Sequence, residues 1–281
     1  MRAGAVRSFL RRGRRMVIRW LQGFSIEYRR VDAWPASVPD DWRDRGATRR
    51  FEAGFAGGDF MEGVKPYGGA TPLVLDQLEA LRRTGLTHAS LLDFGCGNGT
   101  YREILASNAA TRVWSYTGAD INESLVATCR RRFPGARFEP TADGEPLPFA
   151  NGEFDIVLAS GVLQYCEHPL RTLLELHRVS SKWVLVSRVP VRKWCADGVY
   201  VQHVRHPWGR EAHAMHIFNR QNLETMFARV GFNIAWWDYG DDAFAVEDEP
   251  EKATNLLYLL RQAAGHAEST ADAIQKRSQD F

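Results

Sequence analysis

The sequence predicts an α/β fold in which a mostly parallel sheet carries helices on both faces. Short apolar runs alternate with amphipathic stretches between residues 71 and 262, and a glycine-rich turn directly follows the first apolar run. Strands that alternate with helices in this way are typical of parallel sheets. The chain has 281 residues, of which 44% are hydrophobic and 25% charged, so it can bury one sizeable core.

The expected elements follow one another with short connections. A first helix is expected to begin at Thr71-Pro72, where threonine is a good N-cap and proline a good first helical residue, and to end at Gly85. Asn219 is expected to cap another helix that runs to Val230. The expected strands lie at 90–94, within 113–119, near 136–139, and at 154–160, 182–187, 232–239 and 255–262, and the expected helices between them at 101–107, 122–132 and 169–179.

The two ends of the chain differ from this body. Residues 1–50 hold 13 Arg and 5 acidic residues, a net charge of +8, which leaves −6 on the other 231 residues. Apolar residues recur at helical spacing among the first of these arginines, so we expect a basic amphipathic arm over 1–30. Such an arm suits a phosphate-rich partner, and contact of residues 1–24 with a membrane surface is one possibility; a packed or disordered tail is the other. We expect an irregular lead-in over 31–70 and a flexible tail over 263–281.

The cysteines and the apolar runs indicate a cytoplasmic protein. The four cysteines, Cys96, Cys129, Cys166 and Cys195, form no CxxC pair, which is typical of reduced cysteine. No apolar run approaches the roughly 20 residues of a membrane-spanning helix. The apolar stretch behind the first arginines is too short for a secretory signal.

A glycine-rich motif, D-x-G-x-G-x-G over residues 93–99, is the strongest chemical signal. It lies between an expected strand and an expected helix. Its glycines allow a sharp turn and the close approach of a ligand to the main chain. Open α/β sheets bind ligands at this end of a strand. Thr100 stands where a dinucleotide fingerprint needs glycine or alanine, which disfavours a nicotinamide-dependent oxidoreductase, although that class stays as an alternative.

Two acidic residues follow the next two strands. Asp120 lies 25 residues beyond Gly95 and can accept hydrogen bonds from both hydroxyls of a ribose, with Ile121 as a pocket wall. Asp143 lies in a turn where it can accept from the amino group of a base, with Gly144 presenting its backbone. Each acid could instead be a helix cap or a plain turn residue.

Four segments in order, LLDFGCGNG, GADI, ADGEPLPF and FDIVLASGVLQY, resemble the class I S-adenosylmethionine-dependent methyltransferases over residues 71–262. The resemblance implies a Rossmann-like sheet of seven strands, the last one antiparallel, and S-adenosyl-L-methionine as cofactor. It implies that Asp93 lies near the amino group of the cofactor, Asp120 at the ribose and Asp143 at the adenine. The cofactor-binding residues that it implies are Asp93, Gly95, Cys96, Gly97, Asn98, Gly99, Asp120, Ile121, Asp143, Gly144 and Ser160.

A narrower resemblance concerns the acceptor of the methyl group. The segments VLQY, SRVPV, VYVQHV and HIFNRQNLE resemble methyltransferases encoded in bacterial surface-polysaccharide gene clusters, although the arginine-rich start and the histidines depart from that group. It implies a small-molecule or glycan acceptor, such as a hydroxyl of a polysaccharide precursor. The Asp/Asn-Pro-Pro-aromatic motif of many base-methylating enzymes is absent after the fourth strand, so nucleic acid is not the expected partner.

Residues 189–219 form the longest expected insertion, and we interpret them as a substrate-binding loop. Its two H-x-x-H pairs do not predict a metal site. The segment VYVQHV looks like a strand, where residues three apart face opposite sides, and no acid or cysteine is arranged to complete a ligand set. The aromatic and hydrogen-bonding side chains of the insertion suit a sugar, so we expect it to bind a sugar-containing acceptor. These side chains are Trp194, Tyr200, Trp208, His203, His206, His213 and His216.

The catalytic candidates come from this insertion and from the segment after the fourth strand. A hydroxyl acceptor would need a base near neutral pH, which histidine can supply. Tyr165 could shape the acceptor site or simply pack. The candidates are His203, His206 and Tyr165, with His168 as a further base. The alternative is a non-catalytic protein of the same fold that serves as a partner in a membrane-associated assembly.

Overall fold

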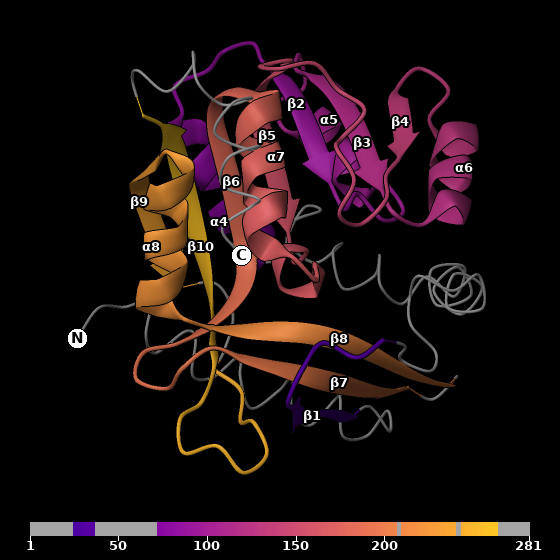
Figure 1. The fold of residues 1–281 in the computed structure, drawn as a ribbon. Helices are drawn as coiled ribbons and strands as arrows, with labels where there is room; N and C mark the ends of the chain where they lie inside the picture. Colours follow the sequence, from indigo (N-terminus) through magenta and orange to yellow (C-terminus); the bar gives the residue numbers. More distant parts are fainter. Residues whose placement is uncertain (1–24, 37–71, 207–208, 240–242, 264–281) are drawn as a thin grey trace.

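The main sheet has the predicted seven strands, in the order β4-β3-β2-β5-β6-β10-β9 (Figure 1). The computed structural model describes residues 25–36, 72–206, 209–239 and 243–263. The strands are β2 (Ser90–Phe94), β3 (Ser115–Asp120), β4 (Arg137–Pro140), β5 (Phe154–Ser160), β6 (Ser180–Arg192), β9 (Phe232–Tyr239) and β10 (Thr254–Gln262). The strands from β4 to β6 are parallel, and β10 runs antiparallel to both of its neighbours, which confirms the predicted antiparallel last strand.

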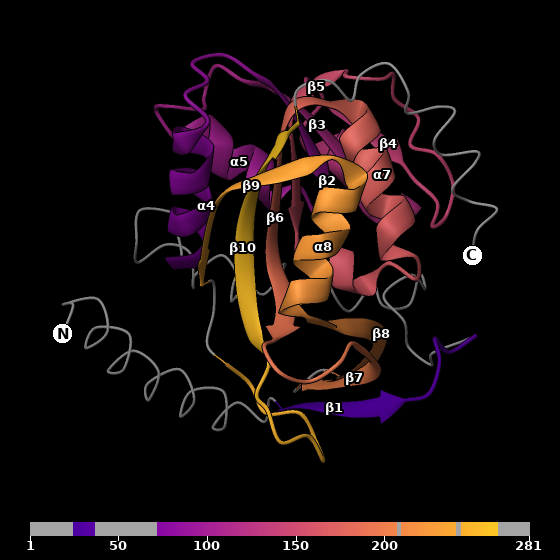
Figure 2. The same cartoon turned by 60° about the vertical axis from the view of Figure 1, so that its left-hand side comes forward.

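Helices cover both faces of this sheet, as predicted (Figure 2). One face carries α4 (Pro72–Arg83), α5 (Thr100–Ser107) and α6 (Glu123–Arg132), and the other carries α7 (Pro169–Val179) and α8 (Arg220–Val230). Consecutive strand residues serve opposite cores: Leu91 packs with the first group of helices and Leu92 with the second. Strands covered on both faces read as nearly continuous apolar runs, which is why the sequence reveals them.

Side-chain caps fix where two helices begin. The Oδ1 atom of Asn122 accepts from the backbone N–H groups of Ser124 and Leu125 at 3.1 and 3.2 Å. Asn219 caps α8 in the same way, as its sequence position predicts, and Gly231 ends that helix in a left-handed conformation. The cap at Asn122 starts α6 directly after the end of β3 at Asp120.

The insertion at 189–219 is not the loop that we expected. It comprises the end of β6 and a hairpin of β7 (Gly198–His206) and β8 (Gly209–Asn219). The strand β1 (Ser25–Val31) pairs antiparallel with β7. It runs across residue 30, where we predicted the boundary between the basic arm and the lead-in. Apolar residues alternate along these strands and bury a small core of their own, with Tyr28, Tyr200, Met215 and Ile217 at its centre.

The three-stranded sheet lies at the carboxyl end of the parallel strands (Figure 1). Strand β6 extends past its last pairing with β5, at Ser187, and its end pairs with β8 through Val191 and Arg192. One strand thus belongs to both sheets. No helix among the described residues is long and apolar enough to cross a membrane. The arm over 1–24, most of the lead-in and the tail lie outside the described residues.

A buried ion pair ties this small sheet to the segment before β10. The side chain of Arg192 is fully buried, and its Nη1 atom lies 2.8 Å from Oε2 of Glu249. The Oε1 atom of Glu249 accepts from the hydroxyl of Tyr200 at 2.7 Å and from Nη1 of Arg30 at 2.9 Å. Charges taken out of water need such partners, because an uncompensated buried charge is strongly destabilising.

We therefore expect Glu249→Ala to lower the free energy of unfolding by about 3–5 kcal/mol, since it leaves the guanidinium of Arg192 buried without its counter-ion. Urea unfolding would measure the change. Glu247→Ala, at a nearby exposed acid, is the matched control and should change the free energy by no more than about 0.5 kcal/mol. Equal stability of the two variants would show that the ion pair does not hold the small sheet in place.

Candidate functional site

The glycine-rich segment forms a loop between β2 and α5 that only glycines fit. Gly95, Gly97 and Gly99 have φ angles of 75°, 54° and 77°, in the left-handed region that side chains disfavour. A Cβ atom on Gly95 would lie 2.2 Å from Cγ2 of Val162, so the two backbones approach closely. A Cβ atom on Gly97 would have no atom of the described residues within 4 Å, so among them this part of the main chain is open to a ligand.

The carboxylate of Asp120 fastens this loop to the end of β3. Its Oδ2 atom accepts from the backbone N–H of Gly97 at 2.8 Å, and Oδ1 accepts from that of Asn122 at 2.9 Å. Burial raises the pKa of Asp120, and these backbone hydrogen bonds oppose the rise. A carboxylate has about four acceptor positions, and the backbone N–H groups of Gly97, Asn122 and Ile121 occupy three of them, so the group can still accept from a ligand.

A second carboxyl group, Asp93, lies beneath the loop. It is 1% exposed and accepts a 2.7 Å hydrogen bond from the hydroxyl of Tyr116. Burial raises its pKa to about 7; the bond from Tyr116 opposes this and the charge of Asp120 adds to it. Two buried carboxyl groups close together favour a cationic ligand group at the base of the loop.

A polar cluster covers the end of β5 and the neighbouring part of β6, around Ser187. Gln77 of α4 donates to Ser160 Oγ at 2.8 Å and to Ser187 Oγ at 2.6 Å. Tyr101 of α5 donates to Oε1 of Gln77, and burial raises the pKa of this phenol to about 12. Only Ser160 is among the predicted site residues. The polar Gln77 within the apolar stripe of α4 is the signal that could have revealed the others.

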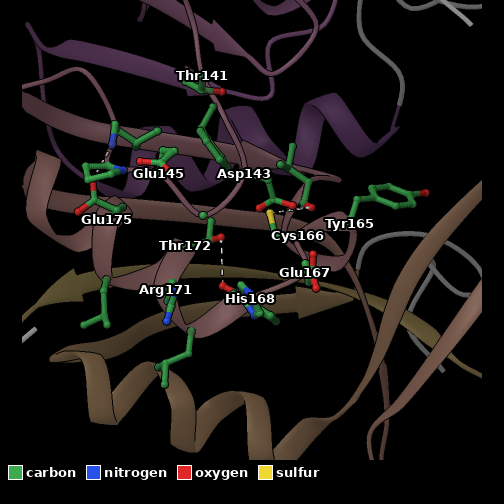
Figure 3. A pocket seen from close by; sticks show the side chains of 18 of the residues that line it. Thr141, Asp143, Glu145, Tyr165, Cys166, Glu167, His168, Arg171, Thr172 and Glu175 are labelled. Atoms are coloured by element: carbon green, nitrogen blue, oxygen red, sulfur yellow. Dashed lines mark hydrogen bonds between the residues drawn. The ribbon is translucent and has the colours of Figure 1, made fainter. Parts of the chain in front are cut away.

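A cavity of about 1360 Å³ opens beside the loop. It brings together five predicted residues: Gly95, Ile121, Asp143, Gly144 and Tyr165. Figure 3 shows Thr141, Asp143 and Glu145 on one side of it and residues from the start of α7 on the other. Its volume exceeds the roughly 300–1,000 Å³ of common small-molecule pockets, so it has room for a second ligand beside a nucleoside.

The predicted catalytic candidate Tyr165 lines this cavity but its hydroxyl is engaged. It donates to Oε1 of Gln202 at 2.9 Å, and Nε2 of Gln202 donates to the hydroxyl of Tyr28 at 3.2 Å. Burial raises the pKa of Tyr165 to about 12. The phenol therefore stays protonated near neutral pH and links the cavity wall to the hairpin.

The histidines of the hairpin do not gather at the cavity. His203 follows Gln202 on β7 and so points to the opposite side from Tyr165, where it is exposed in a separate hollow with Arg29, Arg205 and Arg210. The side chain of His206 lies outside the described residues. His213 lies 3.4 Å from Glu211, and His216 stacks on Trp34 with the ring centroids 4.9 Å apart. No three His, Cys, Asp or Glu side chains of the described chain are grouped to hold a metal.

The remaining base candidate, His168, does reach the cavity. It directly precedes α7, is exposed, and lines the same cavity as Gly95 and Ile121. Figure 3 shows it close to Thr172, whose hydroxyl donates to its backbone oxygen at 3.3 Å. This bond uses the backbone of His168 only, and its imidazole makes no hydrogen bond with a described residue.

The raised pKa of Asp93 predicts that stability falls as pH rises. Between its ordinary value of 3.8 and about 7 the folded protein binds the proton more tightly than the unfolded chain does, so stability decreases through this window. The full difference corresponds to about 4 kcal/mol as an upper bound. Urea titrations at pH 5 and pH 8 should show this loss in the ligand-free protein, and Asp93→Asn should remove most of it. An equally steep loss in that variant would assign the pH dependence to other groups.

Part of the chain matches a family of known domains. Residues 92–182 match the family described as "Methyltransferase domain". The chain is 34% identical over 111 residues to phthiotriol/phenolphthiotriol dimycocerosates methyltransferase 1 of Mycobacterium ulcerans, which covers 37% of this chain and 40% of that protein. It is 32% identical over 94 residues to the biotin biosynthesis bifunctional protein BioHC of Cellvibrio japonicus, covering 34% of this chain and 18% of that one. The chain thus spans less than half the length of these curated relatives.

Solved structures extend the likeness of the fold beyond this segment. The 1,6-didemethyltoxoflavin-N1-methyltransferase of Burkholderia thailandensis, solved with its substrate and S-adenosylhomocysteine, has a TM-score of 0.52 at 17% identity and covers 83% of this chain and 94% of that one. An S-adenosylmethionine-dependent methyltransferase of Clostridium acetobutylicum has a TM-score of 0.51 at 10% identity and covers 76% and 100%. At these identities the likeness shows the fold alone. Residues 92–182 thus match a methyltransferase domain, and the chain has the Rossmann-like fold of these methyltransferases.

Proposed function

We propose that this protein transfers the methyl group of S-adenosylmethionine to a small molecule bound in the cavity beside the glycine loop. The observation that carries the proposal is the open main chain at Gly97, with two buried carboxyl groups below it and a 1360 Å³ cavity beside it. When bound, the cofactor supplies an already activated methyl group on a sulfonium. The protein then mainly has to hold acceptor and cofactor in line.

The cofactor roles follow from the position of each acid. Asp120, a carboxylate at the end of β3 beside the glycine loop, would take the ribose hydroxyls. The buried Asp93 would attract the cationic amino group of the cofactor. Asp143 and Gly144 lie in the cavity wall next to Ile121, where an adenine would be held between polar and apolar groups.

A small acceptor fits the cavity better than the glycan that the narrower resemblance implies. The aromatic residues expected to bind a sugar lie apart: Trp194 is 77% exposed, whereas Tyr200 is fully buried and bonded to Glu249. Trp208 lies outside the described residues. The similar Burkholderia enzyme, solved with a small heterocycle, gives a precedent for such an acceptor on this fold. A polysaccharide hydroxyl stays a prediction that a mass-shift screen with methyl-deuterated cofactor, run on glycan precursors beside small molecules, would test.

Asp120→Ala should weaken S-adenosylhomocysteine binding by about 1.5–3 kcal/mol, the contribution of hydrogen bonds to a charged group. Calorimetry should show this as a loss of roughly 10- to 150-fold in affinity. Glu123→Ala, three residues away and exposed, is the control and should bind normally. NAD should not bind the wild type at all. Unchanged affinity in a folded Asp120→Ala variant would remove this residue from the ribose role, and tight NAD binding would favour the oxidoreductase alternative.

If the acceptor is a hydroxyl, we expect His168 to be its base, because it is the described imidazole that lines the cavity. His168→Ala should slow methyl transfer by about 100-fold, within the usual range for loss of a general base. His203→Ala, on the far side of β7, is the matched control and should keep full turnover. Turnover would be followed with labelled cofactor and the acceptor that the mass-shift screen finds. Full activity of His168→Ala on a hydroxyl would show that the base lies elsewhere.

A further inference from the structure

Arg188 stands in an unfavourable backbone conformation in the middle of the longest strand. Its φ angle is 58°, and Asp248 is the other non-glycine residue with a positive φ in the described part of the chain. Strand β10 pairs Leu257 with Ser187 and Leu256 with Val189, so Arg188 is the extra residue of a β-bulge. Bulges often re-aim a side chain beside a functional site, and strain of this kind persists only where the surrounding structure enforces it.

The bulge directs the guanidinium over the backbone that follows β5. A Cβ atom built on Gly161 would lie 3.4 Å from both Cζ and Nη1 of Arg188. Gly161 itself donates from its N–H to the carbonyl of Ser187 at 2.8 Å, which holds the two strand ends together. The next residue, Val162, contacts Gly95 of the glycine loop and lines the cavity. The guanidinium thus lies one residue from the wall where loop and cavity meet.

The charge of this guanidinium has no partner within the described chain. Arg188 is exposed and makes no hydrogen bond or ion pair with any described residue, whereas Arg192, four residues on, has Glu249. Its charge acts on two partly buried phenols from different elements, Tyr101 and Tyr165, and opposes the rise that burial causes in the pKa of each. Both phenols remain neutral and can donate hydrogen bonds, so neither neutralises it.

We propose that Arg188 binds an anionic group of the methyl acceptor, a carboxylate or a phosphate, at the rim of the cavity beside Gly161 and Tyr165. A planar guanidinium binds either group through two parallel hydrogen bonds. This inference rests on the proposed function and names its substrate class: the acceptor is an acid. The cofactor also ends in a carboxylate, but the glycine loop that would hold it has the buried acids Asp93 and Asp120, whereas Arg188 lies beside Gly161 and acts on Tyr165 of the cavity wall.

Three variants separate charge, geometry and strain. Arg188→Gly removes the guanidinium and allows the left-handed conformation, so its melting temperature should not fall. Asp248→Gly relieves the same strain away from the site and is the matched control. Arg188→Lys keeps the charge without the planar fork. Methyl transfer from labelled S-adenosylmethionine would be measured on a library of small carboxylic acids and phosphate esters, each beside its neutral amide or alcohol.

The expected result is that the wild type methylates acids in preference to their neutral analogues. Arg188→Gly should raise the KM for the acid by about 10- to 100-fold, as for loss of a charged hydrogen-bonding group. The KM of Arg188→Lys should lie between those of the wild type and Arg188→Gly, and Asp248→Gly should have the KM of the wild type. Affinity for S-adenosylhomocysteine should stay within about twofold in all of them. An unchanged KM in Arg188→Gly, or equal use of neutral analogues by the wild type, would overturn the proposal.

Two further measurements distinguish the other outcomes. If Arg188→Gly binds S-adenosylhomocysteine more weakly but 5′-methylthioadenosine normally, the guanidinium holds the carboxylate of the cofactor and the acceptor proposal is wrong. Inorganic phosphate should raise the melting temperature of the wild type at constant ionic strength, with or without S-adenosylhomocysteine, and should not do so in Arg188→Gly. A wild type that shows this phosphate effect but binds no S-adenosylhomocysteine would refute the proposed function while keeping the anion site.

Discussion

The site depends first on the hydrogen bond between the backbone N–H of Gly97 and the buried carboxylate of Asp120. Three glycines in left-handed conformations have no side chains with which to hold a loop in shape, and their freedom in the unfolded chain opposes its formation. The carboxylate supplies the missing constraint from the end of β3, and it also receives the first N–H of the next turn, at Asn122. Close packing of Val162 on Gly95 holds the loop from the other side. The loop can therefore be rigid and still present bare main chain to a ligand.

The second determinant is the length of β6. Most parallel strands of the sheet end where the glycine loop begins, but β6 continues to Arg192 and enters a second sheet. The hairpin that follows turns back over the carboxyl edge, and the chain of hydrogen bonds from Tyr165 through Gln202 to Tyr28 fastens it there. The wall of the cavity thus comes from the core domain and its outer support from the hairpin. The ion pair of Arg192 and Glu249 sets how the core domain and the hairpin meet, since separation of the pair would leave the guanidinium of Arg192 buried without a counter-ion.

How much of this could be predicted from the sequence varies with the range of the interaction involved. Local patterns were sufficient for the core elements, the glycine loop and the cap at Asn219, because each depends on neighbouring residues or on strict periodicity. The antiparallel last strand was predicted from the family resemblance. Only the first strand of the hairpin could be predicted, from VYVQHV; AHAMHIF does not alternate, since His213 and His216 are three residues apart, and it was read as part of a loop. His203 was chosen for its residue type, but its role depends on which face of β7 points inward, and that follows only from the pairing with β1 and β8. Gln77 and Arg188 could not be predicted, since a buried polar contact between α4 and two strand ends, and a bulge, are set by tertiary packing.

The titration of the site argues for catalysis by alignment more than by proton transfer. The two phenols near the reacting region, Tyr101 and Tyr165, have pKa values of about 12 and donate hydrogen bonds at neutral pH, so neither can collect a proton. Asp93 titrates near 7 but lies buried under the loop, bonded to Tyr116, where an acceptor could not reach it. An activated methyl donor tolerates this scarcity of bases, because in-line displacement gains most from orientation. The guanidinium of Arg188, whose backbone a β-bulge holds beside Gly161, would orient a charged acceptor at one end, while the buried carboxyl groups would orient the cofactor.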